Sequence, residues 1–152
     1  KLTMLAERQL NFLLNSRLNG HFPAFLNTQT LGFNFGIQGM QFNATSTTAE
    51  SQMLSNPMYV HSISNNNDNQ DIVSMGTNAA VITGKVIENA FEVLAIETIT
   101  IVQAIDALGY DGKVSSVTKK LYNDVRAIVP KFKEDQVMYP YVQKVKEHLM
   151  SI

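Results

Sequence analysis

Apolar residues recur along most of the chain at helical spacing. In residues 1–18 the leucines return every third or fourth position, charged residues lie between them, and a glycine follows at position 20. This pattern predicts an amphipathic helix that ends where glycine can adopt a left-handed cap. An irregular segment over 21–36 comes next. We predict further helices over about 37–55, 73–108, 116–129 and 140–150.

The segment 73–108 is the longest predicted helix, and its apolar positions cover more than one face while charges are sparse. A helix that is apolar most of the way round is buried on most sides. A small monomer has difficulty burying such a helix, so we expect packing in an oligomer. No alternating strand pattern and no internal repeat are found. The prediction for residues 1–152 is therefore one all-α region, a helical bundle with one long central helix.

Charge and composition exclude several classes of partner. Lys and Arg number 12 against 13 Asp and Glu, for a formal net charge of -1. This balance provides no basic surface for nucleic acid or an anionic membrane, and the apolar runs are too short to span one. The chain has no Cys, which excludes disulfides and thiol chemistry and fits a reducing compartment. With no signal segment after Lys1, we expect a cytoplasmic fragment of a longer protein.

A long stretch of the chain is almost uncharged. Between Arg17 and Lys85 there is no Lys or Arg, and the only acids are Glu50, Asp68 and Asp71. Solvated surfaces normally carry about a quarter or more charged residues. A stretch rich in Asn and Gln but poor in charge indicates burial at a subunit interface or along the lining of a site.

The sequence lacks the short motifs that usually indicate a particular catalytic chemistry. The sequence has no glycine-rich phosphate loop, no helix with paired His, and no Gly-x-Ser-x-Gly elbow. Its three histidines are His21, His61 and His148, which are far apart and have no acidic or Cys partner at ligand spacing. We therefore expect no metal site.

The polar loop over 58–71 has two interpretations. It can be a solvated surface loop whose Asn side chains cap turns. Alternatively, Gln70 and its neighbours line a pocket at the start of the long helix. Backbone N–H groups and the helix dipole there favour a carboxylate or a developing anion. Composition alone leaves both interpretations open.

Several short segments, taken in their order along the chain, resemble segments of a known protein family. The segments are Gly32-Phe33-Asn34-Phe35-Gly36, Gln41, Ala49-Glu50-Ser51, Asn56-Pro57 and Asn69-Gln70-Asp71-Ile72-Val73-Ser74-Met75-Gly76. In this order they resemble the C-terminal region of the histidine, phenylalanine and tyrosine ammonia-lyases. Ala6-Glu7-Arg8 resembles the family's Ser-Glu-Arg-Arg segment. The resemblance covers about the first 110 residues, and from Lys113 onwards only helical character and length match.

The resemblance implies a carbon–nitrogen lyase that eliminates ammonia from an aromatic amino acid and works as a helical homotetramer. Such enzymes use a 4-methylidene-imidazol-5-one (MIO) electrophile made from an internal Ala-Ser-Gly. This chain contains no Ala-Ser-Gly and lacks the segment that carries the family's tyrosine base. By this resemblance the chain binds no cofactor itself, is inactive alone, and supplies one wall of an active site and oligomer contacts.

The resemblance also assigns the site residues. Gln70 takes the position of the family's active-site Gln or Glu and is the candidate catalytic residue, with Asn69, Gln70 and Asp71 as substrate-binding residues. Histidine enzymes typically have Gln-Glu-Asp here, whereas phenylalanine and tyrosine enzymes have Asn-Gln-Asp. A neutral Gln also avoids the desolvation cost of a buried carboxylate, so the triplet points away from histidine. The alternatives left open are an aromatic aminomutase and a non-catalytic helical assembly module.

Overall fold

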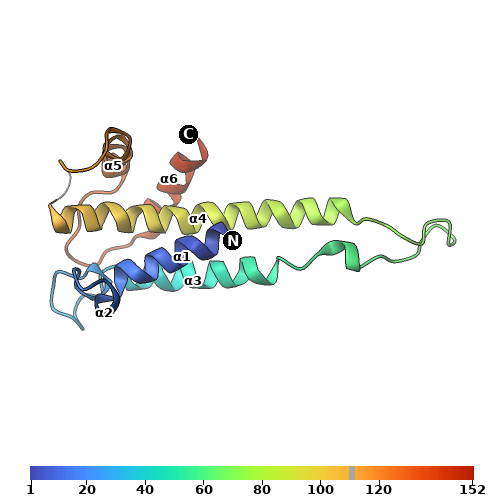
Figure 1. Cartoon of the computed structure of the whole chain (residues 1–152), viewed down its shortest axis with the longest axis horizontal. Helices are drawn as coiled ribbons and strands as arrows, with labels where there is room; N and C mark the ends of the chain where they lie inside the picture. The colour runs from blue at the N-terminus through green and yellow to red at the C-terminus, as the bar shows by residue number, and fades with distance from the viewer. Residues whose placement is uncertain (110–111) are drawn as a thin grey trace.

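The computed structural model describes residues 1–109 and 112–152, and these residues contain helices and no strand (Figure 1), so the predicted all-α class is confirmed. The α-helices are α1 (Leu2–Leu14), α2 (Ser16–Asn19), α3 (Gln38–Met53), α4 (Gly76–Leu108), α5 (Ser116–Ile128) and α6 (Tyr139–Met150). Two short 3-10 helices are η1 (Ala24–Leu26) and η2 (Met58–Val60). In this described part no helix is long and apolar enough to cross a membrane.

The 33-residue helix α4 is the axis of the fold. Helices α1 and α3 pack along one side of it, and α5 and α6 pack on the other (Figure 1). The predicted bundle with one long central helix is therefore present. Between α3 and α4 the chain runs out past the bundle as an extended loop and returns (Figure 1).

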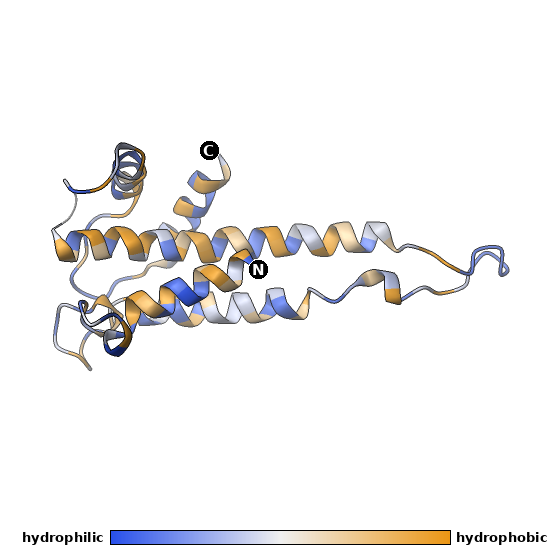
Figure 2. Cartoon of the chain, in the orientation of Figure 1, coloured by the Kyte–Doolittle hydropathy of each residue, from blue (hydrophilic) through white to orange (hydrophobic). Residues whose placement is uncertain are grey.

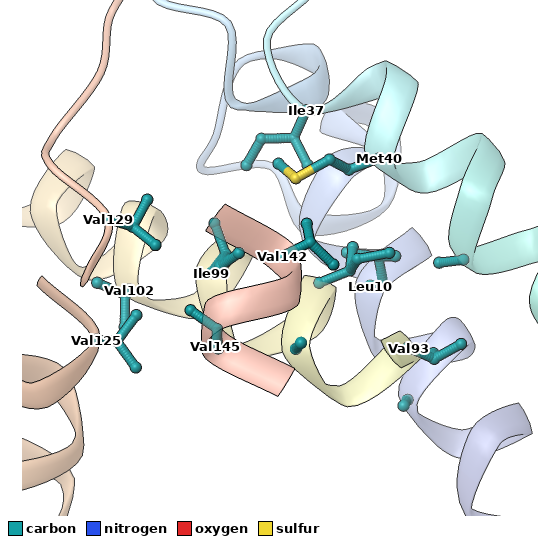
Figure 3. Packing of buried hydrophobic residues seen from close by; sticks show 14 of the residues in the cluster. Leu10, Ile37, Met40, Val93, Ile99, Val102, Val125, Val129, Val142 and Val145 are labelled. Atoms are coloured by element: carbon teal, nitrogen blue, oxygen red, sulfur yellow. The ribbon is translucent and has the colours of Figure 1, made fainter. Parts of the chain in front are cut away.

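The core lies where all these helices meet the C-terminal half of α4. Leu10 of α1, Ile99 of α4 and Val145 of α6 are completely buried and lie in one cluster (Figure 3). Val129, which follows α5, closes the cluster at the other end. Burial of each such side chain stabilises the fold by about 1.5–3 kcal/mol.

The two halves of α4 differ in burial. Its buried residues begin at Asn89 and end at Ala104. Before Asn89 no residue of the helix is buried, and Val81 and Ile87 are 70% and 49% exposed, although Glu88 forms an ion pair of 2.7 Å with Lys146 of α6. In the single chain the first half of α4 is therefore not buried on most sides, and its burial in an oligomer stays a prediction. Figure 2 shows that this half still carries apolar residues.

Two helix boundaries also differ from the sequence prediction. The predicted helix 1–18 breaks at Asn15, whose backbone is extended and whose side chain accepts a hydrogen bond of 3.0 Å from the Arg17 N–H. An Asn cap of this kind offers the backbone an alternative to continuing the helix. The long helix begins at Gly76 and not near Val73, because Met75 has a left-handed φ of 53°.

A polar cluster fixes α5 against α4. Arg126 forms an ion pair of 2.6 Å with Asp106 and donates a hydrogen bond of 2.8 Å to Gln103 Oε1. The Tyr122 hydroxyl donates to the other Asp106 oxygen at 2.5 Å. This hydrogen bond to Asp106, together with burial and the nearby negative charge, raises the pKa of Tyr122 above its ordinary value of 10.0.

Candidate functional site

The predicted site residues lie on the loop that projects between η2 and α4, here named the hairpin loop (residues 61–75). Asn65 and Gln70 form an antiparallel bridge, in which the Asn65 N–H donates to Gln70 O at 2.9 Å and the Gln70 N–H donates to Asn65 O at 3.3 Å. Figure 2 shows the hydrophilic tip beyond the bridge. The backbone of Gln70 is therefore held in place by its own loop.

The turn at the tip has an uncommon backbone. Asn66, Asn67 and Asp68 all have left-handed φ values, of 54°, 54° and 62°. Asn and Asp tolerate this conformation better than other residues with a Cβ. The Ser64 hydroxyl donates to the Asp68 carboxylate at 2.7 Å, and the Asn69 N–H donates to Asn66 O at 3.2 Å. The unusual run of Asn in the sequence thus corresponds to a left-handed turn, which Asn and Asp form more easily than other residues with a Cβ.

A serine closes the base of the hairpin loop. The Ser62 hydroxyl donates to the main-chain oxygen of Asp71 at 3.1 Å and accepts from the Val73 N–H at 2.7 Å. Asn69 and Asp71 therefore shape the loop through their backbones. Within residues 1–109 and 112–152, no hydrogen bond reaches the side chains of Asn69, Gln70 or Asp71, and all three residues are exposed.

The structure places Gln70 away from the buried part of α4. Six positions separate Gln70 from Gly76, where α4 begins, and the first turn of α4 is itself largely exposed. Five cavities in the described bundle are lined by residues outside the hairpin loop. The Gln70 side chain therefore lies outside all five.

A cavity lies elsewhere, where the start of α3 faces the start of α6. Its volume is about 600 Å³. Phe35, Phe42 and Tyr139 supply aromatic lining, and Glu92 supplies a carboxylate whose Oε1 accepts from Asn43 Nδ2 at 2.8 Å. Aromatic walls with a few polar groups are typical of small-molecule sites. The sequence analysis did not predict this cavity, because its walls come from segments about 100 residues apart.

Asp135 holds the two walls of this cavity together. Its carboxylate accepts from the Phe35 N–H at 2.8 Å and from the Gly36 N–H at 2.9 Å, and its own N–H donates to Asn34 Oδ1 at 3.0 Å. Gly36 has φ 59°, and a Cβ there would lie 2.6 Å from the Phe25 carbonyl oxygen. Only glycine fits this turn without strain.

Three titratable groups outside the hairpin loop and this cavity have shifted pKa values: burial raises the pKa of Glu97, the hydrogen bond to Asp106 raises that of Tyr122, and the hydrogen bond from Lys120 lowers that of Asp124. The described part of the chain also holds no cluster of three or more potential metal ligands. The polar and aromatic side chains of the hairpin loop and the cavity can contact and orient a molecule.

Comparison with known proteins shows what the whole arrangement is similar to. A family model described as aromatic amino acid lyase matches residues 1–127. Histidine ammonia-lyase of Staphylococcus aureus is 38% identical over 149 residues, which cover 98% of this chain and 29% of that protein. The similarity thus extends well beyond residue 110, where the sequence analysis placed its end.

Solved structures agree in fold. A tyrosine aminomutase from Streptomyces globisporus matches with a TM-score of 0.93 and 35% identity, over 98% of this chain and 28% of that chain. A phenylalanine aminomutase from Pantoea agglomerans matches with a TM-score of 0.93 and 32% identity, over 98% of this chain and 29% of that chain. This chain therefore spans less than a third of the length of these relatives.

Proposed function

Because this chain belongs to the aromatic amino acid lyase family, we propose that it is part of a longer carbon–nitrogen lyase. That enzyme eliminates ammonia from an aromatic amino acid (histidine, phenylalanine or tyrosine) and gives an α,β-unsaturated acid. The observation that supports this most directly is the hairpin loop. It presents Gln70 on a fixed backbone with its side chain exposed.

Gln70 is the catalytic residue in this proposal, and it acts by contacting the amine of the substrate. A glutamine amide both donates and accepts hydrogen bonds without carrying a charge. Asn69 and Asp71 are the neighbouring substrate-binding residues, whose side chains are exposed beside it. Because these three residues are exposed in this chain, other polypeptide completes the site in this proposal.

The reactive electrophile does not come from this chain. With no Ala-Ser-Gly among its 152 residues, the chain cannot form a 4-methylidene-imidazol-5-one group. In the proposed longer enzyme that group supplies an electrophile for the loss of the amine and is formed elsewhere. We therefore expect the isolated chain to be inactive.

Oligomer contacts are the second part of the proposed function, with a homotetramer as the expected assembly. The first half of α4 and the segments that lead to it expose Tyr59, Val60, Ile63, Ile72 and Val81, each by 59% or more. Large apolar groups in one exposed region mark an interaction surface. Assembly on this surface would also bring other polypeptide close to Gln70.

A second candidate is an aminomutase, which re-adds the amine at the β-carbon. The names of the two structural relatives favour it, since both are aminomutases. The two reactions share the elimination and differ in how long the unsaturated acid is retained. The exposed residues of this chain do not separate them.

The test uses the longer protein that contains this chain. It is mixed separately with histidine, phenylalanine and tyrosine, and the ultraviolet absorbance of the conjugated acid product is followed. A rise with phenylalanine or tyrosine supports both the lyase and the interpretation of Gln70. A rise with histidine alone supports the lyase and overturns that interpretation. No rise, together with a β-amino acid product detected by mass spectrometry, identifies the aminomutase. If neither product is detected, the non-catalytic helical assembly module is the interpretation that remains.

A further inference from the structure

Two sets of hydrogen bonds join the outgoing arm of the hairpin loop (61–65) to its returning arm (70–75), beyond the end of the bundle (Figure 1). The outer set is the bridge between Asn65 and Gln70, in which each backbone N–H donates to the carbonyl oxygen of the other residue. A single side chain makes the inner set. The Ser62 hydroxyl donates to Asp71 O at 3.1 Å and accepts from the Val73 N–H at 2.7 Å. The returning arm is thus held at Gln70 and again directly after it.

Burial contributes little to the position of the returning arm in this chain. Ile72 is 86% exposed, and none of residues 71–75 is buried. The helix α4 begins only at Gly76, so its own hydrogen bonds do not hold these residues. A segment with few buried contacts keeps its position mainly through the hydrogen bonds of its backbone. The two bonds of Ser62 are therefore a main support of the residues that follow Gln70.

The chemistry of a hydroxyl suits both contacts of Ser62. A hydroxyl carries one donor hydrogen and two acceptor lone pairs, so its oxygen can donate to a carbonyl and accept from an N–H at the same time. Alanine at this position removes both bonds. Threonine keeps the hydroxyl, and its β-branched side chain suits extended backbone. Ser62 is exposed in this chain, which leaves room for the additional methyl group.

We propose that Ser62 is a positioning residue for the reaction, which acts through Gln70 and does not touch the substrate. This inference rests on the proposed function, in which the Gln70 amide contacts the amine of the substrate. Gln70 and Asp71 share a peptide bond, so the hydrogen bond from Ser62 to the Asp71 carbonyl limits how far Gln70 shifts or turns. A displacement of about 1 Å in a reacting group can lower a rate about a hundredfold. The hydroxyl thus fixes the place from which the amide makes its contact.

A double-mutant cycle in the longer enzyme tests whether Ser62 acts through Gln70. We expect Ser62→Ala to lower kcat about tenfold or more, because the amide loses its fixed position. KM changes little, because the lost interaction is one that strengthens in the transition state. In the double variant, Ser62→Ala adds nothing to the loss caused by Gln70→Ala, since no amide is left to position. Effects that multiply would show that Ser62 acts independently of Gln70, and they would overturn the proposal.

Two single variants separate the hydroxyl of Ser62 from a general effect of substitution. Ser62→Thr keeps the hydroxyl and retains most of kcat. The matched control is Ser55→Ala, which removes another exposed hydroxyl, one that donates to Gln52 O at 2.6 Å before the hairpin loop begins. This control leaves kcat unchanged. A threonine variant as slow as Ser62→Ala, or a control as slow, contradicts the proposal.

Hydrogen exchange in the longer protein provides a measurement that does not need activity. Ser62→Ala makes exchange faster at the Val73 amide, which loses its acceptor, and at the Gln70 amide, whose bridge to Asn65 loosens. Ser62→Thr keeps exchange slow at both amides. Unchanged exchange at both amides in Ser62→Ala overturns the proposal, whatever the activity of the enzyme.

The same variants distinguish a failure of this inference from a failure of the proposed function. If Gln70→Ala leaves kcat unchanged, the catalytic role of Gln70 is wrong, and the role of Ser62 is overturned with it. If Gln70→Ala is slow while Ser62→Ala is as fast as wild type, the role of Gln70 stands and only the role of Ser62 is overturned.

Discussion

Arg126 of α5 pairs with Asp106 of α4 at 2.6 Å, and their side chains are only 13% and 9% exposed. Among the ion pairs of residues 1–109 and 112–152, no other has both side chains so deeply buried. The same arginine donates to the Val129 carbonyl at 3.0 Å, so the pair also fixes the chain that leaves α5. The attachment of α5 to the bundle thus depends on charge as well as on the buried Val125.

We predict that Arg126→Ala lowers the free energy of unfolding by about 3–5 kcal/mol, because Asp106 then remains buried and unpaired. Urea denaturation followed by circular dichroism measures the change. The double variant Arg126→Met with Asp106→Leu recovers most of the loss, since no uncompensated charge is left. A double variant as unstable as Arg126→Ala would contradict this explanation.

Tyr122 makes the stability of the fold depend on pH in the alkaline range. Its hydrogen bond to Asp106 raises its pKa, so the folded state keeps a proton that the unfolded state loses above about pH 10. Stability is therefore fully present below pH 10 and falls as pH rises toward the folded pKa. Tyr122→Phe removes this loss. We expect the difference in unfolding free energy between wild type and Tyr122→Phe to shrink above pH 10, and a constant difference would refute the linkage.

Substitution of two glycines by alanine is expected to change the stability of the fold in opposite directions. Gly36→Ala places a Cβ 2.6 Å from the Phe25 carbonyl in a left-handed turn, and we predict a loss of about 2–4 kcal/mol from strain and backbone displacement. Gly84→Ala lies in α4 with nothing within 4 Å. There the substitution stabilises the chain by about 0.5–1 kcal/mol. Thermal unfolding of both variants against wild type measures the two shifts, and equal shifts would refute the structural distinction.

Asp135→Asn tests the link between the two walls of the cavity between α3 and α6. The carboxylate accepts from two backbone N–H groups, and the neutral amide replaces one acceptor oxygen by a donor. We predict a loss of about 1 kcal/mol, at the low end for a charged hydrogen bond because the contact is exposed. Hydrogen exchange at the Phe35 and Gly36 amides becomes faster. Unchanged exchange at both amides would show that Asp135 does not hold the loop.

Gln70→Ala, made in the longer enzyme, separates activity from stability. Since Gln70 is exposed and its side chain has no partner in the described chain, the substitution leaves the unfolding free energy of the 152-residue chain within about 0.5 kcal/mol. The proposed catalytic contact predicts a fall in kcat on the order of a hundredfold. Gln52→Ala, an exposed glutamine on α3, is the control and leaves kcat unchanged. Equal activity of the two variants would remove Gln70 from the proposed site.

The all-α class and the long central helix followed from the sequence because helical spacing of apolar residues is a local signal. Local signals also explain the errors at boundaries. Asn15 interrupts a leucine pattern that continues to Leu18, and Met75 takes a left-handed conformation that no propensity predicts. The spacing of apolar residues carries no information about the backbone angles of one residue, so it predicts neither change.

The candidate site stays a prediction. The order of segments along the chain suggests Asn69, Gln70 and Asp71, but it did not predict their exposed position on the hairpin loop, because exposure depends on what packs beside the loop. Asp135 gave no signal at all, since its partners Phe35 and Gly36 lie about 100 residues away.

The uneven burial of α4 divides one continuous helix into two thermodynamic units. At about 1.5 Å per residue its 33 residues extend about 50 Å, but only the part from Asn89 to Ala104 is held by the core. Isolated helices of the length of the remaining part are marginal in water. The amides before Asn89 therefore open by local fraying at small cost, whereas those after it exchange only when the bundle unfolds. The leading half of α4 and the hairpin loop attached to it therefore have little protection from the core until another surface covers them.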